Sequence, residues 1–69
     1  MKQLNARQLQ SLLSVRGWSF VRQNGGSHMQ FKKIGVDRII TIPVHGSRPI
    51  PIGLLRKILR DAEIDPSEI

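Results

Sequence analysis

A short run of glycine, serine, histidine and lysine contains the residue types best suited to acid–base chemistry on an anion. The run reads Gly25-Gly26-Ser27-His28-Met29-Gln30-Phe31-Lys32. The two glycines predict a tight turn, and the alternation that follows them predicts a strand with Met29 and Phe31 on one face. His28, Gln30 and Lys32 then share the other face. A histidine beside a turn, with a lysine on the same face, is suited to proton transfer next to a negatively charged substrate, although a simple solvated histidine has the same pattern.

The charge of the chain favours a polyanionic partner. Eleven Lys and Arg face five Asp and Glu, for a net charge of +6. Four of the acids lie in the last nine residues, so Asp37 is the one carboxylate among the first 60 residues. This distribution is typical of nucleic-acid binding. A basic surface that serves only solubility has the same composition, so that reading stays open.

Length and composition exclude several classes of protein. With 69 residues and 39% apolar residues, we expect one domain over residues 1–69 with a modest core. The absence of cysteine excludes disulfides and thiolate zinc sites. No apolar run has membrane-spanning length, so we expect a cytoplasmic protein with no membrane contact. Two histidines and one central aspartate do not supply a two-metal nuclease, and no phosphate-binding glycine motif occurs, so no metal or cofactor is expected.

Metal-free cleavage of RNA remains compatible with these residues, because RNA carries its own nucleophile in the 2′-hydroxyl group. His28 is the expected base, and Lys32, Arg22 or Arg48 could stabilise charge on the phosphoryl oxygens. His45, in a loop ahead of a predicted helix, is an acid, a phosphate ligand or a plain loop residue. The residues expected to contact nucleic acid are Arg22, Gly26, Ser27, Gln30, Lys32, His45 and Arg48.

The elements that must position these side chains follow from local signals. Asn5 as N-cap with Gln8 three residues later predicts a helix over about Ala6–Arg16. An apolar stripe at helical spacing predicts a second helix that begins at Pro51. The ending Asp65-Pro66-Ser67-Glu68 resembles a helix start with too little chain left for a helix.

Three strands are expected between the helices. Alternation predicts Trp18–Arg22, a loop at Gln23–Gly26, and a second strand over about Ser27–Lys33. The β-branched run Arg38–Ile42 predicts a third strand, ended by Pro43. The fold class is therefore α+β with the order α-β-β-β-α, a three-stranded antiparallel sheet and both helices on one face. Double-stranded RNA-binding domains use this arrangement.

Several of these motifs together resemble the HicA (YcfA-like) mRNA interferase toxins of bacterial toxin–antitoxin systems. The matching segments are Gly17-Trp18, Gly26-Ser27-His28 with Phe31, Thr41-Ile42-Pro43-Val44-His45, and Ile50, Gly53, Leu55, Ile58 and Leu59. The resemblance implies a double-stranded RNA-binding-like fold and an endoribonuclease toxin that acts on mRNA. It also implies that His28 is the catalytic residue and that a cognate HicB-like antitoxin covers the site.

Two other functions fit the same sequence. A non-catalytic RNA-binding module would use the same basic face, and a protein-interaction domain would use the positive charge for an acidic partner. Incubation of the purified protein with single-stranded RNA, with and without a chelator, separates the three readings.

Overall fold

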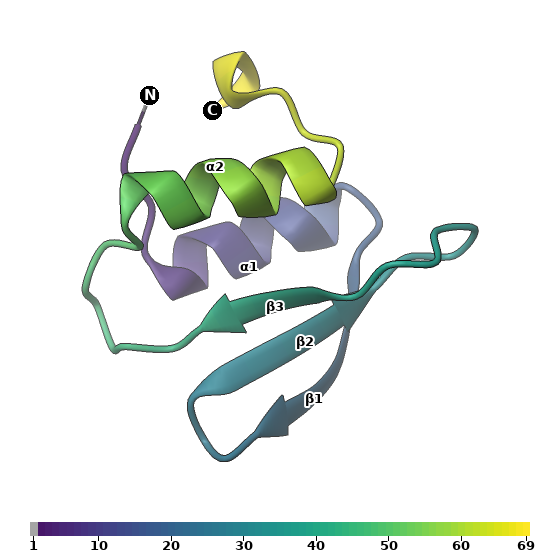
Figure 1. Cartoon of the computed structure of the whole chain (residues 1–69), viewed down its shortest axis with the longest axis horizontal. Helices are drawn as coiled ribbons and strands as arrows, with labels where there is room; N and C mark the ends of the chain where they lie inside the picture. Colours follow the sequence, from purple (N-terminus) through teal and green to yellow (C-terminus); the bar gives the residue numbers. More distant parts are fainter. Residues whose placement is uncertain (1) are drawn as a thin grey trace.

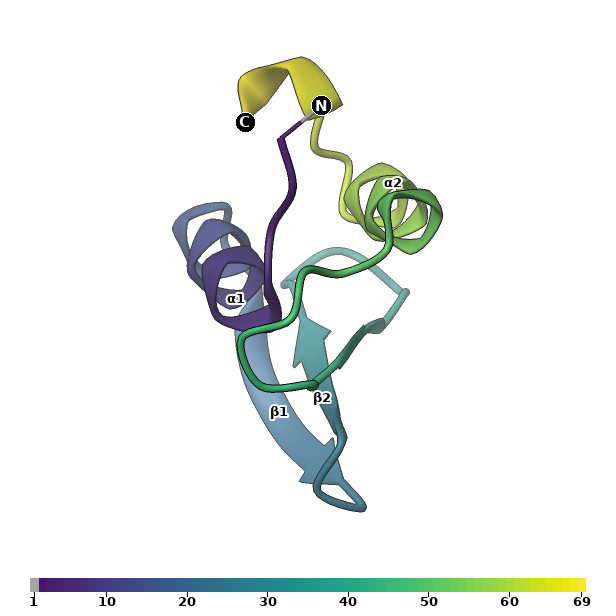
Figure 2. The same ribbon diagram turned by 90° about the vertical axis from the view of Figure 1, so that its left-hand side faces the viewer.

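Two helices lie on one face of a three-stranded antiparallel sheet in the computed structural model of the protein, which describes residues 2–69 (Figures 1 and 2). The strands lie in the order β1-β2-β3. The elements are α1 (Ala6–Val15), β1 (Ser19–Asn24), β2 (His28–Lys32), β3 (Ile40–Pro43), α2 (Ile52–Asp61) and a short 3₁₀ helix, η1 (Pro66–Glu68). This arrangement confirms the predicted α+β fold with the order α-β-β-β-α. Within residues 2–69, every helix is too short or too polar to cross a membrane.

The first helix begins where its capping residues predict. The Asn5 side chain accepts a hydrogen bond from the Gln8 backbone N–H, and the Gln8 side chain accepts one from the Asn5 N–H, both at 2.9 Å. These two bonds satisfy N–H groups that the first turn of a helix leaves free. The helix ends at Val15, one residue before the predicted end, because Arg16 is the C-cap and Gly17 takes a positive φ of 92°.

The strands differ from prediction at their ends. β1 begins one residue after Trp18, which is buried, and continues through Asn24, so two residues predicted as loop belong to the strand. β2 lacks Ser27 and Lys33 at its ends. β3 begins at Ile40 rather than Arg38 and includes Pro43, whose missing N–H is tolerated because β3 is an edge strand.

The core lies between the sheet and the two helices. Phe31 of β2, Ile42 of β3, Leu9 of α1 and Leu55 of α2 are completely buried there. The buried set among residues 2–69 is entirely hydrophobic. Because the helices cover one face of the sheet, the polar side chains of its strands lie on the other face, except for Gln23, which pairs with the buried Met29.

The chain after α2 is more ordered than its sequence suggests. The predicted helix start at Asp65 forms one 3₁₀ turn, in which the Asp65 side chain accepts a hydrogen bond from the Ser67 N–H at 2.9 Å. An ion pair of 3.1 Å between Arg16 and Glu68 ties this turn to the end of α1. The hydrogen bond from Arg16 holds the pKa of the Glu68 carboxyl below its usual value, and a second from the Asp65 N–H acts in the same direction.

Glu63 adopts a backbone conformation that L-residues disfavour, with a positive φ of 60° just after the C-cap of α2. The left-handed region costs an L-residue roughly 1–2 kcal/mol. Glycine avoids that cost but loses more chain entropy, about 0.5–1 kcal/mol. We therefore predict that Glu63→Gly raises the free energy of unfolding by up to about 1 kcal/mol, measured by urea denaturation. Glu63→Ala removes the same charge without the glycine and should give no gain; an equal gain would assign the effect to charge.

Candidate functional site

The face of the sheet turned away from the helices is polar. Figure 2 shows α1 and α2 on one side of the strands and no helix on the other. The residues of this open face, taken from the strand pairing, are Ser19, Arg22 and Asn24 on β1, His28, Gln30 and Lys32 on β2, and Thr41 and Pro43 on β3. This set within residues 2–69 contains two cations and a histidine and lacks a carboxylate. The open face is therefore suited to an anionic ligand.

A β-bulge in β1 brings Arg22 onto the open face. Phe20 pairs with Phe31, but Arg22 pairs with Gln30, so the register shifts by one residue and Val21 is the extra residue. Regular alternation would place Arg22 on the same side as Phe20, toward the helices. The bulge reverses that direction, and the Arg22 Nε donates a hydrogen bond of 2.9 Å to the Gln30 Oε1. The remaining N–H groups of both side chains are left to bind an acceptor.

His28 lies at the first position of β2, exposed to solvent, between Asn24 of β1 and Pro43 of β3. Its Nδ1 lies 3.1 Å from the Ser27 Oγ, within hydrogen-bond distance. When Nδ1 carries the proton, the Ser27 hydroxyl accepts a hydrogen bond from the Nδ1–H, and the Nε2 lone pair is free to take a proton. Within residues 2–69 the Nε2 atom makes no hydrogen bond, so it is open to a substrate.

The backbone around His28 is held on both sides. Gly25 and Gly26 take positive φ values of 57° and 75°, as the predicted turn requires. The Gln23 side chain donates to the Gly26 carbonyl at 2.8 Å. The Val44 N–H donates to the Ser27 carbonyl at 2.7 Å, which ties the turn to the end of β3. These contacts hold the backbone next to His28 and so fix the direction in which its imidazole projects from the sheet.

The two loop residues of the predicted site are less closely associated with His28. His45 follows Val44 directly, so its backbone leaves the sheet beside the Ser27 carbonyl, and its side chain is exposed. Arg48 lies farther along the loop, next to Pro49, which pairs with Asn5 ahead of α1. The backbone at Arg48 has therefore turned from the open face toward the helical layer.

Sequence reasoning missed three polar residues of the open face. Asn24 pairs directly with His28, Thr41 pairs with Gln30, and Ser19 pairs with Lys32. Asn24 was assigned to a loop because the bulge hides the true register of β1. Thr41 was recognised as a strand residue, and alternation with its buried neighbours Ile40 and Ile42 was the signal that would have placed it on this face.

The described residues show no cluster of histidine, aspartate and glutamate side chains. Nowhere in residues 2–69 do three such groups gather closely enough to hold a metal ion. The acidic residues lie at Asp37 in the β2–β3 connection and from Asp61 to the end of the chain, whereas the open face contributes His28 alone.

Comparison with known proteins gives one family. The family model of the HicA toxin of bacterial toxin–antitoxin systems matches residues 6–64. That span begins with α1, contains the whole sheet with the Ser27–His28 pair, and ends just beyond α2. No curated protein matches the chain. Because the match covers most of the 69 residues and both layers of the fold, the chain belongs to the HicA toxin family of bacterial toxin–antitoxin systems.

Proposed function

We propose that this toxin is a metal-independent endoribonuclease that cleaves mRNA, with His28 as the acid–base residue. The observation that carries the proposal is the position of His28, an exposed imidazole at the end of a polar face that holds Arg22 and Lys32 and lacks a carboxylate among the described residues. Cations on such a face attract the phosphates of an RNA strand. We infer a cytoplasmic location, since that is where mRNA is available.

The proposed reaction uses the substrate's own nucleophile. The Nε2 of His28 takes the proton of a ribose 2′-hydroxyl, and the 2′-oxygen forms a bond to the adjacent phosphorus. The bond from phosphorus to the 5′-oxygen of the next nucleotide breaks, and that oxygen receives a proton from a general acid. The products are a 2′,3′-cyclic phosphate and a free 5′-hydroxyl group. In this proposal His28 supplies the base, and Arg22 and Lys32 supply the positive charge.

Ser27 supports His28 in this proposal. In the tautomer with a proton on Nδ1, the Ser27 hydroxyl accepts a hydrogen bond from the Nδ1–H, which leaves Nε2 as the basic nitrogen and limits rotation of the ring. When the ring becomes doubly protonated, the Ser27 hydroxyl still accepts a hydrogen bond from the Nδ1–H. Asn24, directly across the ladder, offers a further amide on the same side.

The other polar groups bind the RNA. The Arg22–Gln30 pair presents N–H donors to phosphate oxygens or to the acceptor edge of a base. Lys32 extends the positive charge to the far end of β2, and the backbone of Gly26 and the Ser27 hydroxyl border the nucleotide at His28. We assign His45 to phosphate binding at the loop, and Arg48 to a more distant, electrostatic contribution.

The first prediction from the proposed function concerns the reaction itself. The purified toxin should cleave single-stranded RNA equally well with and without a chelator, since its proposed chemistry uses no metal ion. It should leave DNA intact, because DNA lacks the 2′-hydroxyl group, and mass spectrometry should find a terminal 2′,3′-cyclic phosphate. Inhibition by the chelator would contradict the mechanism. Binding of RNA without any cleavage would favour the RNA-binding module instead.

The second prediction concerns His28→Ala. The side chain is exposed, so its removal opens no core cavity and should change the free energy of unfolding by no more than about 0.5 kcal/mol. Loss of an acid–base group should slow cleavage by about 10²–10⁴-fold. RNA affinity should fall only slightly, since Arg and Lys contacts to phosphate dominate it.

The matched control for this experiment is His45→Ala, which removes the other imidazole. It should weaken cleavage less than His28→Ala does. Melting curves, a binding titration with RNA and a cleavage assay test the two variants side by side. An unfolded His28→Ala protein would make the histidine structural, and normal cleavage by it would disprove the catalytic assignment.

A toxin of such a system has an antitoxin as its partner. We propose that the partner is a HicB-like protein that covers the open face with acidic side chains. The physical reason is complementarity, since the open face has cations and no carboxylate among the described residues, and opposite charges across an interface give specificity and fast association. Coverage of this face would prevent RNA from reaching His28.

The third prediction tests this occlusion. Charge reversal at Lys32→Glu should weaken antitoxin binding several-fold or more, because it sets like charges against each other. Lys57→Glu on the exposed side of α2 is the control and should have a small effect. Calorimetric titration of both variants with the antitoxin measures the difference. Equal losses, or a complex that still cleaves RNA at the rate of the free toxin, would show that the partner does not act by occlusion.

A further inference from the structure

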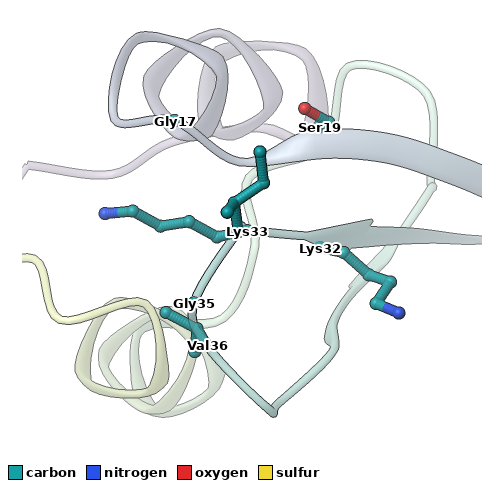
Figure 3. Close-up of a pocket in the computed structure, with 7 residues that line it drawn as sticks. Gly17, Ser19, Lys32, Lys33, Gly35 and Val36 are labelled. Atoms are coloured by element: carbon teal, nitrogen blue, oxygen red, sulfur yellow. The ribbon is translucent and has the colours of Figure 1, made fainter.

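A hollow of about 600 Å³ lies at the end of the sheet opposite His28. Its wall is formed where β2 ends and the chain turns toward β3, close to the end of α1 (Figure 3). The residues that line it include Ser19, Lys32, Lys33, Ile34, Gly35 and Val36. The reaction proposed for His28 uses none of this surface except Lys32.

The hollow is cationic on both sides of the strand. Figure 3 shows the side chains of Lys32 and Lys33 leaving the chain in opposite directions. The Lys33 side chain runs past the end of α1, since a Cβ added at Gly17 would lie 3.3 Å from its Cε. Neither lysine forms a salt bridge within residues 2–69. Both ammonium groups are therefore available to an anion.

The same hollow offers an apolar surface next to these charges. Ile34 is 100% exposed, so its whole side chain is free to contact a ligand. Val36 is half-buried beside it, and the space above Gly35 is open, with no atom within 4 Å of a Cβ added there. A ligand that joins an anionic group to a flat apolar group would satisfy both kinds of surface.

We propose that this hollow is a second nucleotide-binding subsite, which holds a phosphate at Lys33 and a base against Ile34. The proposal rests on the proposed function, because the ligand is the RNA strand that crosses the open face. Ser19 and Lys32 belong to the open face and to the hollow, so the two surfaces are continuous. Lys32 lies four residues after His28 along the strand, about 14 Å at 3.4 Å per residue. Substrates long enough to reach the hollow therefore bind more tightly than short ones.

The test measures binding rather than cleavage. Single-stranded RNA oligonucleotides with 2′-O-methyl groups, which block attack by the 2′-oxygen, are titrated by fluorescence anisotropy in lengths from a dinucleotide to an octanucleotide. Affinity for the wild-type protein should rise with length until the strand reaches the hollow and then level off. Lys33→Gln should weaken binding of the octanucleotide. It should also make the plot of log K against log salt shallower by about 0.7, which corresponds to the loss of one phosphate contact.

Two further variants separate the charge from the apolar contact. Ile34→Ser should weaken binding of the octanucleotide by a factor on the order of tenfold or less. The salt slope should stay unchanged, because an apolar contact releases no counterions. Lys57→Gln removes a positive charge from α2, where Lys57 forms an ion pair with Asp61, and serves as the control. It should reduce affinity less than Lys33→Gln at every salt concentration. The dinucleotide should lose less affinity than the octanucleotide in both hollow variants.

The outcomes distinguish this subsite from the proposed function. Equal effects of Lys33→Gln and Lys57→Gln, or no effect of Ile34→Ser, would overturn the subsite. So would weakened antitoxin binding with unchanged RNA binding, which would assign the hollow to the protein partner. If wild-type protein fails to cleave unmodified RNA yet shows the length dependence and both variant effects, the subsite stands and the endoribonuclease proposal fails.

Discussion

Burial of Met29 and Phe31 is the constraint on which the rest of the structure depends. Phe31 is completely buried and Met29 nearly so, both on the side of the sheet that the helices cover. Because side chains alternate along a strand, this burial turns His28, Gln30 and Lys32 to the opposite side. A slip of one residue in the pairing would bury the histidine and expose the core. The packing that stabilises the fold is therefore the same packing that keeps His28 accessible.

The irregular positions of the structure lie around this regular strand. β1 inserts Val21 and thereby brings Arg22 opposite Gln30. The turn before His28 uses two positive-φ glycines, and a hydrogen bond from Val44 holds its last carbonyl. β2 itself runs without interruption between its two neighbours. Regular alternation along β2 therefore places most of its polar side chains on the open face, and the irregular positions in β1 and in the glycine turn set the directions of Arg22 and His28.

The sequence was informative wherever a local rule settles the conformation. The Asn5–Gln8 capping box, the glycine turn and the alternation of β2 all appear in the structure as predicted. The bulge at Val21 was not predictable, because it depends on which residue of β2 lies opposite, and this long-range pairing leaves no mark in local alternation. The 3₁₀ turn at Pro66 was underestimated for a similar reason, since its ion pair with Arg16 joins residues 52 positions apart in the chain.

The residues of the candidate site also fall into those that local rules predict and those that depend on long-range pairing. Alternation along β2 was enough to group His28 with Gln30 and Lys32, and the structure has all three on the open face. Asn24 required the true register of β1 and was missed, and Ser19 was missed although its alternation with the buried Trp18 indicates this face. Arg48 was predicted to belong to the site because of its charge alone. The pairing of Pro49 with Asn5 leads the backbone at Arg48 away from the open face. The chemical role of His28 stays a proposal that rests on its surroundings.

The bulge in β1 also affects how separate copies of the chain meet. β1 is an edge strand, and Phe20 and Val21 on it are 51% and 47% exposed. A flat, apolar edge with unpaired N–H and C=O groups invites another strand to add to the sheet, which is a route to aggregation. The extra residue interrupts the regular spacing of those groups at the most apolar point of the edge, and a charged guanidinium follows it. The irregularity that orients Arg22 thus also protects the toxin against edge-to-edge association.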